Sequence, residues 1–545
     1  MRHLRRRLIV TTLVIAVGAT RMGLAQFTLQ GPGVNANDFR ITTFATGLNF
    51  PVGMTGLADG SLLVATSNGG DFFGTTLGSL VRLADSNADG VADVRQTLVN
   101  NVPGGRLTSV RRAGDLIAVT GQGQNNPISF YRTGATPGDP LTFLGQLQLT
   151  YPSGSWLHPH SSLAFRASPS QEGEYELYFQ LGSDRNFAET TRTVNLGGTL
   201  GLSATLAGDA IHRVRITDNG TAIAATEHTQ IATGLRNASG LLFHPQTGDL
   251  FIGENGIDGL VNVNEPHSAD ELNVIPAEQL GESIADFGFP GTYQQYRTGT
   301  TVGSDGVLPL VAFQPIPMPD GIEAEGINEI AFTPAAFPSA LRGGLFAGFH
   351  GKFSLGGLQN EENPVAFVNL ATNSYFHIIS NDEPGVGHLD GFHTAEDTLY
   401  ISDMSPSGAL GAAQAGTGRI YAIRSVVVEL AGDYNGNGLV DAADFVVWRR
   451  TLGLTSQLAA DGDRNGIVDP SDYEVWRQNF GGANDALLPL ASNLSVPEPA
   501  TVALAIISAA CMLGARRTWV TWENVSRECQ SGGGYSSSDR KGTIC

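Results

Sequence analysis

The stretch ASGLLFHPQTGDLFIGEN (residues 238–255) holds two short apolar runs separated by a turn that contains proline and glycine. Short runs bounded by turn residues and without a helical period predict two antiparallel strands. The second run recurs along the chain, each time at a turn with glycine or an acidic residue. Its six copies are GSLLVATS (60–67), GDLIAVTG (114–121), YELYFQLG (175–182), GDLFIGEN (248–255), GGLFAGFHG (343–351) and DTLYISDM (397–404).

Most copies follow one short strand, as in HSSLAFRA and INEIAFTP, and precede another, as in GSLVRLA and GRIYAIR. Six unequal units of roughly 55–95 residues predict an all-β, six-bladed β-propeller over residues 27–425. Five or seven blades also fit the sequence, because strand edges between residues 265 and 320 are hard to place. Propellers bind ligands at their central channel, so we expect the functional residues to be scattered along the sequence.

The charge of the chain excludes one class of partner. Its 545 residues include 32 basic and 52 acidic side chains, which gives a formal net charge of −20. Such a protein repels nucleic acid and favours divalent cations. We therefore expect no nucleic-acid binding.

The first 25 residues predict an exported protein. Arginines at positions 2 and 5–7 precede an apolar segment, and Gly23-Leu24-Ala25 matches a signal-peptidase cleavage site. The three cysteines lie at 511, 529 and 545, beyond the globular part, so disulfides should not stabilise it. Core packing and bound metal should do so instead.

The C-terminal part predicts a sorting signal after a linker at 484–495. Segment 496–517 contains Pro-Glu-Pro, an apolar run at 500–514 and two arginines, and it resembles the PEP-CTERM sorting tail of bacterial exported proteins. The resemblance implies processing by an exosortase-type enzyme at the cell surface, with transient membrane anchoring through 500–514. A plain C-terminal anchor is the alternative. Residues 518–545 are rich in glycine and serine and predict disorder.

Between these parts, residues 431–483 contain two loops with the ligand spacing of calcium sites. In DYNGNGLVDAAD (433–444) and DGDRNGIVDPSD (461–472), oxygen-bearing side chains occupy positions 1, 3, 5, 9 and 12, with glycine at position 6. Acidic turns without metal are the alternative. The predicted ligands of the two calcium ions are Asp433, Asn435, Asn437, Asp441 and Asp444 in the first loop, and Asp461, Asp463, Asn465, Asp469 and Asp472 in the second.

This segment resembles a type I dockerin, a small α-helical module whose loops end in aspartate. The resemblance implies calcium-dependent folding and docking to a cohesin-like partner. A weaker match, DSNADGVAD (85–93), has Gln96 at position 12. For that stretch, a solvated turn and a calcium loop both fit.

The propeller segment resembles the glucose/sorbosone dehydrogenase family through GLNFPVGMTGLADGSLLVAT, LYFQLGSDRN, GLRNASGLLFHPQTGDLFIGENG, ADELNVI, FGFPGTY and AFPSALRGGLFAGFHGK, in that order. Members are soluble six-bladed propellers that oxidise sugars with pyrroloquinoline quinone (PQQ) and calcium. The resemblance implies a sugar or aldehyde dehydrogenase tethered through the calcium module.

Individual site residues are carried over from the family pattern as expectations. His160 takes the place of the catalytic base, and His158 is expected to be a neighbouring loop residue. Arg236, Asn237 and Lys352 fall at cofactor-contacting positions. For Lys352, a surface lysine without a role in cofactor binding is an equally good interpretation. The expected calcium residues are the carbonyls of Gly256 and Ile257, supported by Asp270 and Glu271.

Several positions depart from the family pattern. GRLTSVRRAGDLI (105–117) replaces a strand with polar cofactor contacts, Ser183 replaces an aspartate, and only His388 and His393 stand where late arginines would cover the quinone. Two alternatives therefore remain. One is an inactive cell-surface propeller that binds carbohydrate or protein, and the other is a calcium-dependent lactonase using Glu254, Asn237 and Asp270.

Overall fold

The computed structural model describes residues 27–261, 265–351, 365–380, 385–389, 391–426, 430–455 and 457–482. The predicted signal peptide, linker, sorting tail and disordered tail, together with Lys352, lie outside these ranges. Among the described residues, no helix is long and apolar enough to cross a membrane.

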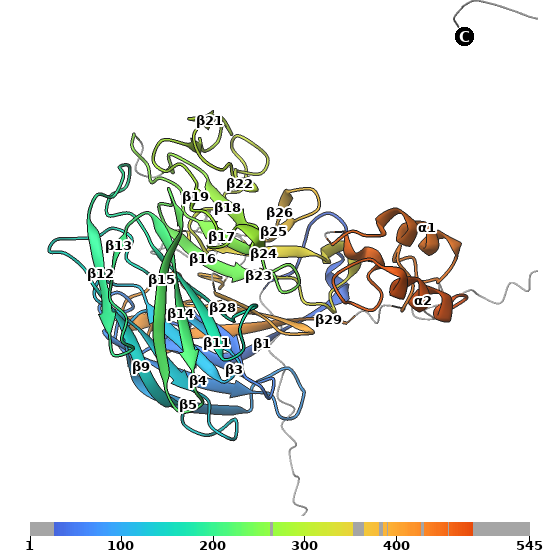
Figure 1. The fold of residues 1–545 in the computed structure, drawn as a ribbon. Helices are drawn as coiled ribbons and strands as arrows, with labels where there is room; N and C mark the ends of the chain where they lie inside the picture. The colour runs from blue at the N-terminus through green and yellow to red at the C-terminus, as the bar shows by residue number, and fades with distance from the viewer. Residues whose placement is uncertain are drawn as a thin grey trace, which may run out of the picture. The chain divides into compact units, whose positions relative to one another are not determined.

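Six antiparallel sheets form the six blades of a β-propeller (Figure 1). Strands β2, β6, β10, β16, β23 and β27 contact one another in succession and form the innermost ring. The sequence prediction of six blades is confirmed, and the alternatives of five or seven are wrong. From the channel outward, the blades are β2 (Met54–Gly56), β3 (Leu62–Ser67), β4 (Leu77–Ala84), β5 (Val94–Pro103); β6 (Leu107–Ala113), β7 (Leu116–Gly121), β8 (Pro127–Arg132), β9 (Thr142–Thr150); β10 (Leu163–Ala167), β11 (Glu174–Leu181), β14 (Ala210–Asp218), β15 (Ile223–Thr233); β16 (Ala238–Phe243), β17 (Leu250–Glu254), β18 (Asp270–Ile275), β22 (Val311–Phe313); β23 (Ile327–Phe332), β24 (Gly344–Phe349), β25 (Val365–Asn369), β26 (Ser374–Ile379); and β27 (Gly391–Thr394), β28 (Thr398–Asp403), β29 (Gly418–Ser425), β1 (Phe39–Leu48).

Five short strands add to this frame. The hairpin of β12 (Thr193–Gly198) and β13 (Ala204–Ala207) extends the outer edge of the second blade by pairing with β9. Strand β19 (Ala285–Asp286) adds in parallel to β15, and β20 (Tyr293–Gln294) pairs with β21 (Thr301–Val302). The region from 265 to 320 therefore completes the fourth blade with β18 and β22, adds β19 to the third blade, and forms no separate blade.

The first strand of the chain closes the ring. Strand β1 pairs antiparallel with β29, from Phe39 opposite Ser425 to Leu48 opposite Gly418, and so becomes the outermost strand of the sixth blade. Apolar side chains fill each of the six spaces between neighbouring blades. Each blade is hydrophobic on both faces, which explains the nearly continuous apolar runs of the repeats.

Hydroxyl groups link neighbouring blades around the channel. Thr108 Oγ1 donates to the carbonyl of Ser161 at 2.5 Å, and Ser162 Oγ donates to that of Ala238 at 2.6 Å. Ser239 Oγ donates in the same way to the carbonyl of Ile327 on the fifth blade. These bonds satisfy buried carbonyl groups and hold the loops at the channel in register.

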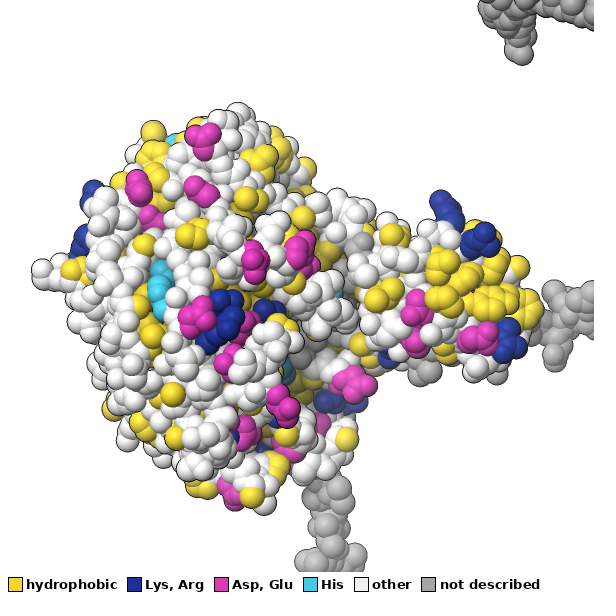
Figure 2. All heavy atoms as spheres, viewed as in Figure 1, with side chains coloured by type: hydrophobic (Ala, Val, Ile, Leu, Met, Phe, Trp, Pro, Cys, Tyr) yellow, Lys and Arg dark blue, Asp and Glu magenta, His cyan; other side chains and the backbone are white. Residues whose placement is uncertain are grey.

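The predicted calcium module contains two short helices, α1 (Ala442–Thr451) and α2 (Pro470–Asn479). Hydrophobic side chains gather over these helices in the space-filling view (Figure 2). They include rings of Phe445, Trp448, Tyr473 and Trp476 that contact one another across the helix pair. These half-buried rings join the two helices beside a small buried core of Tyr434, Leu458, Ala460 and Val468.

Candidate functional site

A cavity of about 440 Å³ opens at the end of the channel where the innermost strands begin. Its walls come from different blades, as shown by Val52 before β2, Thr108 on β6, Ser161 before β10, Asn237 before β16 and Asn328 on β23. The size is typical of a small-molecule site. The expected scattering of site residues along the sequence is confirmed.

His158 lines this cavity, whereas His160 does not. The Nε2 atom of His158 is buried and has no hydrogen-bond partner among the described residues. Burial, with contributions from Arg236 and His350, lowers the pKa of His158 well below its usual 6.5. His158 is therefore a neutral imidazole with a free nitrogen at neutral pH.

His160 is fully buried behind the cavity wall. Its Nδ1 atom lies 2.9 Å from the hydroxyl of Tyr151, and the same hydroxyl accepts a bond from the His160 backbone amide. Burial lowers the pKa of His160 to about 4. His158 therefore lies in the cavity wall, whereas His160, the predicted base, is buried and does not line the cavity.

Backbone hydrogen bonds fix His158 next to Arg236. The amide of His158 donates to the carbonyl of Ser183 at 2.9 Å, and the amide of Ser183 donates to the carbonyl of Arg236 at 2.8 Å. Ser183 is fully buried, and its hydroxyl has no partner among the described residues. The position where the sequence lacks an aspartate therefore connects two cavity residues through its backbone.

Arg236 lines the cavity as expected and is 1 % exposed. Its Nη2 atom lies 2.6 Å from Oδ2 of Asp258 and donates to Oδ1 of Asn186 at 2.8 Å. Its neighbour Asn237 donates to Oδ1 of Asn255 at 2.7 Å. Both predicted cofactor contacts are held rigidly by these partners, so the cavity is preorganised for a polar ligand.

Arg106 also lines the cavity, although the sequence pattern did not select it. It stands in GRLTSVRRAGDLI, directly before β6, with its guanidinium carbon 5.4 Å from the centre of the Phe73 ring. Burial lowers the pKa of this guanidinium. The stretch interpreted as a loss of polar contacts thus supplies a second cation to the cavity. The sequence feature that could have identified Arg106 as a cavity residue is its position directly before an innermost strand.

Asp270 braces the loop that was predicted to hold calcium. Its Oδ1 atom accepts from the amide of Gly256 at 2.8 Å, and Oδ2 accepts from the amide of Ile327 at 2.6 Å. Burial raises the pKa of Asp270 to about 6. The carbonyl of Ile257 already accepts the amides of His267 at 2.7 Å and Ser268 at 3.2 Å. In this conformation both lone pairs of that predicted ligand are engaged.

A second cavity of about 20 Å³ lies behind the same loop and has Glu254 and Glu271 in its wall. Burial raises the pKa of Glu271 to about 7 and that of Glu254 well above its usual value. The space fits one water or one ion. A buried and a half-buried carboxyl group at such a space are suited to a hard cation.

The two late histidines do not line the main cavity. His388 is fully buried, with Nδ1 2.7 Å from the carbonyl of His350. His393 lines a different cavity, which is described below. His350 is the late-blade histidine that reaches the main cavity wall.

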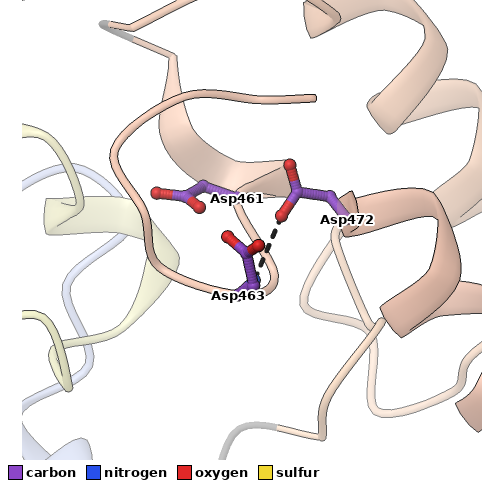
Figure 3. A group of neighbouring side chains, drawn as sticks. All are labelled: Asp461, Asp463 and Asp472. Atoms are coloured by element: carbon purple, nitrogen blue, oxygen red, sulfur yellow. Dashed lines mark hydrogen bonds between the residues drawn. The ribbon is translucent and has the colours of Figure 1, made fainter. Parts of the chain in front are cut away.

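In the helical module, the second loop gathers its carboxylates. Ligand oxygens of Asp461, Asp463 and Asp472 lie within 4.8 Å of one another, and Figure 3 shows the three side chains converging. Asp461 accepts the amides of Asn465 at 3.0 Å and Gly466 at 2.9 Å. Burial raises the pKa values of Asp461 and Asp472, as expected for acidic groups forced together without a counter-ion.

The first loop repeats this geometry. Asp433 accepts the amides of Asn437 at 3.1 Å and Gly438 at 2.6 Å. Asp441 and Asp444 form a capping box at the start of α1, as Asp469 and Asp472 do at the start of α2. The position-9 and position-12 residues of both loops therefore also start a helix.

The two halves of the module exchange tryptophan hydrogen bonds. Nε1 of Trp448 donates to the carbonyl of Asp469 at 2.9 Å, and Nε1 of Trp476 donates to that of Asp441 at 2.8 Å. Each helix is thus tied to the opposite loop, so any metal bound in one loop acts on both helices.

The loop at 85–93, between β4 and β5, is the weaker match to the calcium-loop pattern, and it has the same hydrogen bonds at its start. Asp85 accepts the amides of Asp89 at 3.1 Å and Gly90 at 2.8 Å. Asp93 accepts the amide of Ser86 at 2.8 Å. Gln96, at position 12, donates instead to the carbonyl of Gly138, so this loop lacks the closing ligand of the other two.

Three solved structures illustrate the similarity of the fold. A Trichoderma reesei carbohydrate-active enzyme of family AA12, in a calcium structure, is 17 % identical over 74 % of this chain and 99 % of its own, with a TM-score of 0.48. The PQQ domain of pyranose dehydrogenase from Coprinopsis cinerea is 14 % identical over 72 % and 98 %, with a TM-score of 0.48. A PQQ-bound aldose sugar dehydrogenase from Streptomyces coelicolor is 17 % identical over 71 % and 98 %, with a TM-score of 0.44. No family model and no curated protein matches the sequence.

Proposed function

We propose that the propeller is a PQQ- and calcium-dependent dehydrogenase that oxidises a hydroxyl group of a sugar or a hydrated aldehyde. The observation that carries the proposal is His158, a neutral imidazole with an unpartnered Nε2 that lines the same cavity as Arg106 and Arg236. A base and two cations around one space suit proton abstraction beside an anionic cofactor.

The residues of the cavity fit PQQ in size and in chemistry. PQQ is a flat quinone with three carboxylates, and a cavity of about 440 Å³ accommodates it. Arg106 supplies a guanidinium group for its carboxylates, and Gln122 and Asn328 supply amide donors. Arg236 supplies a second guanidinium, whose charge is shared with its partner Asp258. Asp258, Asp270 and Glu325 also line the wall and favour a cation beside the cofactor. Phe73 and Trp156 add apolar surface for its ring system.

In this proposal His158 accepts the proton of the substrate hydroxyl at Nε2. The chemistry that bound PQQ would supply is acceptance of the hydride from the carbon that carries this hydroxyl, so that this carbon becomes a carbonyl. Burial keeps His158 neutral before the reaction, and Asp258 and Asn186 hold Arg236 in place. The bonds from Asp270 to Gly256 and Ile327 keep the loop beside the cavity in one conformation.

The pH dependence of turnover follows from the environment of His158. Its pKa is lowered, so the neutral base persists as the pH falls through 6.5 and is lost only at a more acidic pH. We expect the acid limb of the kcat/KM profile to lie below pH 6.5. A profile measured with a dye acceptor from pH 4 to 9 would test this, and a limb above pH 7 would contradict the assignment of His158.

The cofactor assignment is tested by titrating the full-length protein with PQQ in calcium buffer, following quinone absorbance. Arg106→Gln should weaken binding about tenfold or more, because one charge-assisted contact is lost. The matched control is Arg112→Gln, at the opposite end of the same strand and outside this cavity. Absence of saturable binding, or equal losses in both variants, would overturn the proposal.

The lactonase alternative has less support from the geometry. Asn237 and Asp270 line the main cavity, whereas Glu254 faces the small cavity behind the loop and accepts the amide of Arg236 at 2.6 Å. The three residues therefore do not surround one space. Nε2 of His160 and of His377 is also buried without a partner among the described residues, so the place of His158 in the main cavity wall is what favours a catalytic over a non-catalytic propeller.

The remaining proposals concern the rest of the chain. The helical module is a dockerin-like unit that binds two calcium ions and docks to a cohesin-like protein, as the paired loops and the convergence of Asp461, Asp463 and Asp472 support. The protein is exported and displayed at the cell surface, where an exosortase-type enzyme processes its C-terminal tail. The support for export is the sequence of the two ends.

A further inference from the structure

A separate cavity of about 360 Å³ lies at the other end of the propeller channel. Its wall contains residues at or near the ends of innermost strands, namely Thr55 and Gly56 of β2, Arg112 of β6 and His393 of β27. The main cavity is lined where such strands begin. The two spaces therefore occupy opposite ends of the channel.

An ion pair crosses the channel beside this cavity. Nη2 of Arg111 on β6 lies 2.6 Å from Oε2 of Glu329 on β23. Strand β6 belongs to the second blade and β23 to the fifth, which is opposite in a six-bladed ring. The side chains of Arg111 and Glu329 are only 11 % and 7 % exposed. The carboxylate of Glu329 therefore neutralises the charge of Arg111 within the channel.

Arg112, the next residue, has no such partner. Its Nε atom is buried without a hydrogen bond, and its guanidinium makes one long contact of 3.5 Å, from Nη1 to the carbonyl of Gly56. No described carboxylate forms an ion pair with it, and none lines the cavity. Nearby Asp59 is already paired with Arg82 at 2.6 Å. A half-buried cation without a counter-ion is costly unless a ligand supplies the charge.

A second polar group, His393, lines the same cavity. The His393 ring lies nearly parallel to that of Tyr400, at 6.4 Å between centroids and 15° between planes. Gly56 makes room for it, because a Cβ atom there would lie 2.9 Å from Nε2 of His393. His393 thus has a defined position in the cavity and can donate a hydrogen bond as a neutral imidazole.

We propose that this cavity binds a small oxyanion, a carboxylate or phosphate group, with Arg112 as the charged contact and His393 as a second donor. A guanidinium fork matches both groups, and the absence of acidic side chains from the wall favours an anion in a chain of net charge −20. The site is independent of the proposed cofactor cavity, so either proposal can fail alone.

The test measures the thermal unfolding of the full-length protein in an anion-poor buffer with added inorganic phosphate or acetate, up to about 20 mM. Both probes are oxyanions, and the one that binds more tightly shows whether the natural ligand carries a phosphate or a carboxylate group. We expect Tm to rise in the wild-type protein and in Arg106→Gln, whose altered residue lies in the main cavity. Arg112→Gln should reduce the apparent affinity about tenfold or more.

Two further measurements keep the proposal open to refutation. Arg112→Lys retains the charge and should recover part of the anion response even if Arg112→Gln folds poorly, and calorimetric titration at fixed temperature gives the affinity without unfolding. An unchanged response in Arg112→Gln, or no response of the wild-type protein to either anion, would overturn the proposal. A loss caused by Arg106→Gln alone would move anion binding to the main cavity and would equally overturn it.

Discussion

Replacing His158 by alanine should lower kcat by about 10²–10⁴-fold, the usual contribution of a positioned general base. His158 is the cavity histidine whose Nε2 is free, so no described neighbour substitutes for it in the same place. PQQ affinity should change much less than kcat, because the guanidinium groups of Arg106 and Arg236 remain. Single-turnover reduction of a preloaded PQQ protein by substrate measures the step directly.

The matched control is His160→Gln, two residues away in the same loop. His160 supports Tyr151 from a fully buried position, so this variant should lose thermal stability and retain most of its single-turnover rate. If His160→Gln abolishes the reaction while His158→Ala leaves it intact, the base is His160, as the family resemblance implied, and the cavity geometry has been interpreted wrongly.

Removing calcium should unfold the helical module while the propeller stays folded. Without metal, the carboxylates of Asp461, Asp463 and Asp472 are held within 4.8 Å and repel one another, and metal binding supplies folding free energy in such sites. The ties from Trp448 and Trp476 to the opposite loops should spread the loss to both helices. Tryptophan fluorescence and far-ultraviolet circular dichroism during chelation and calcium readdition would report it.

Asp463→Ala removes a predicted metal ligand whose other hydrogen bonds, from the amide and the side chain of Asn465, are local and exposed. Asp463 is exposed and caps no helix, so the variant should need about tenfold or more calcium for the same signal. Glu474→Gln is the control, because Glu474 is an exposed acid on α2 that pairs only with Arg477 among the described residues. Equal calcium midpoints in the two variants would contradict the assignment of the second loop.

Repeated patterns were the predictable part of this molecule. The strand runs, such as LFIG at 250–253, are apolar because both faces of a blade are buried, and this physical constraint appears directly in the composition. The loops of the helical module were predictable for a similar reason, since cation ligands must recur at fixed spacing. In both cases local chemistry carries the structural information.

The sequence predicted which types of residue line the cavity, but not which side chains point into it. His158 and His160 stand in one irregular loop, where no strand period tells which side chain points inward. Arg106 directly precedes β6 and Arg112 lies near its end, and the two line cavities at opposite ends of the channel. These positions depend on packing among several blades. The engaged carbonyl of Ile257 depends in the same way on His267 and Ser268, which lie later in the chain.

The pairing of β1 with β29 constrains how the protein can mature. Strand β1 follows the N-terminal segment almost directly, yet its partner ends at Ser425, so the two are separated by nearly the whole propeller in sequence. During synthesis or transport, the early blades emerge while β1 still has no partner for its backbone groups. Ring closure is then a late event with a high loop-closure cost, and an unpaired strand edge persists until it occurs. In a chain cut short before β29, the unpaired edge of β1 should therefore stay accessible to proteases and chaperones, even though its first five blades are all present.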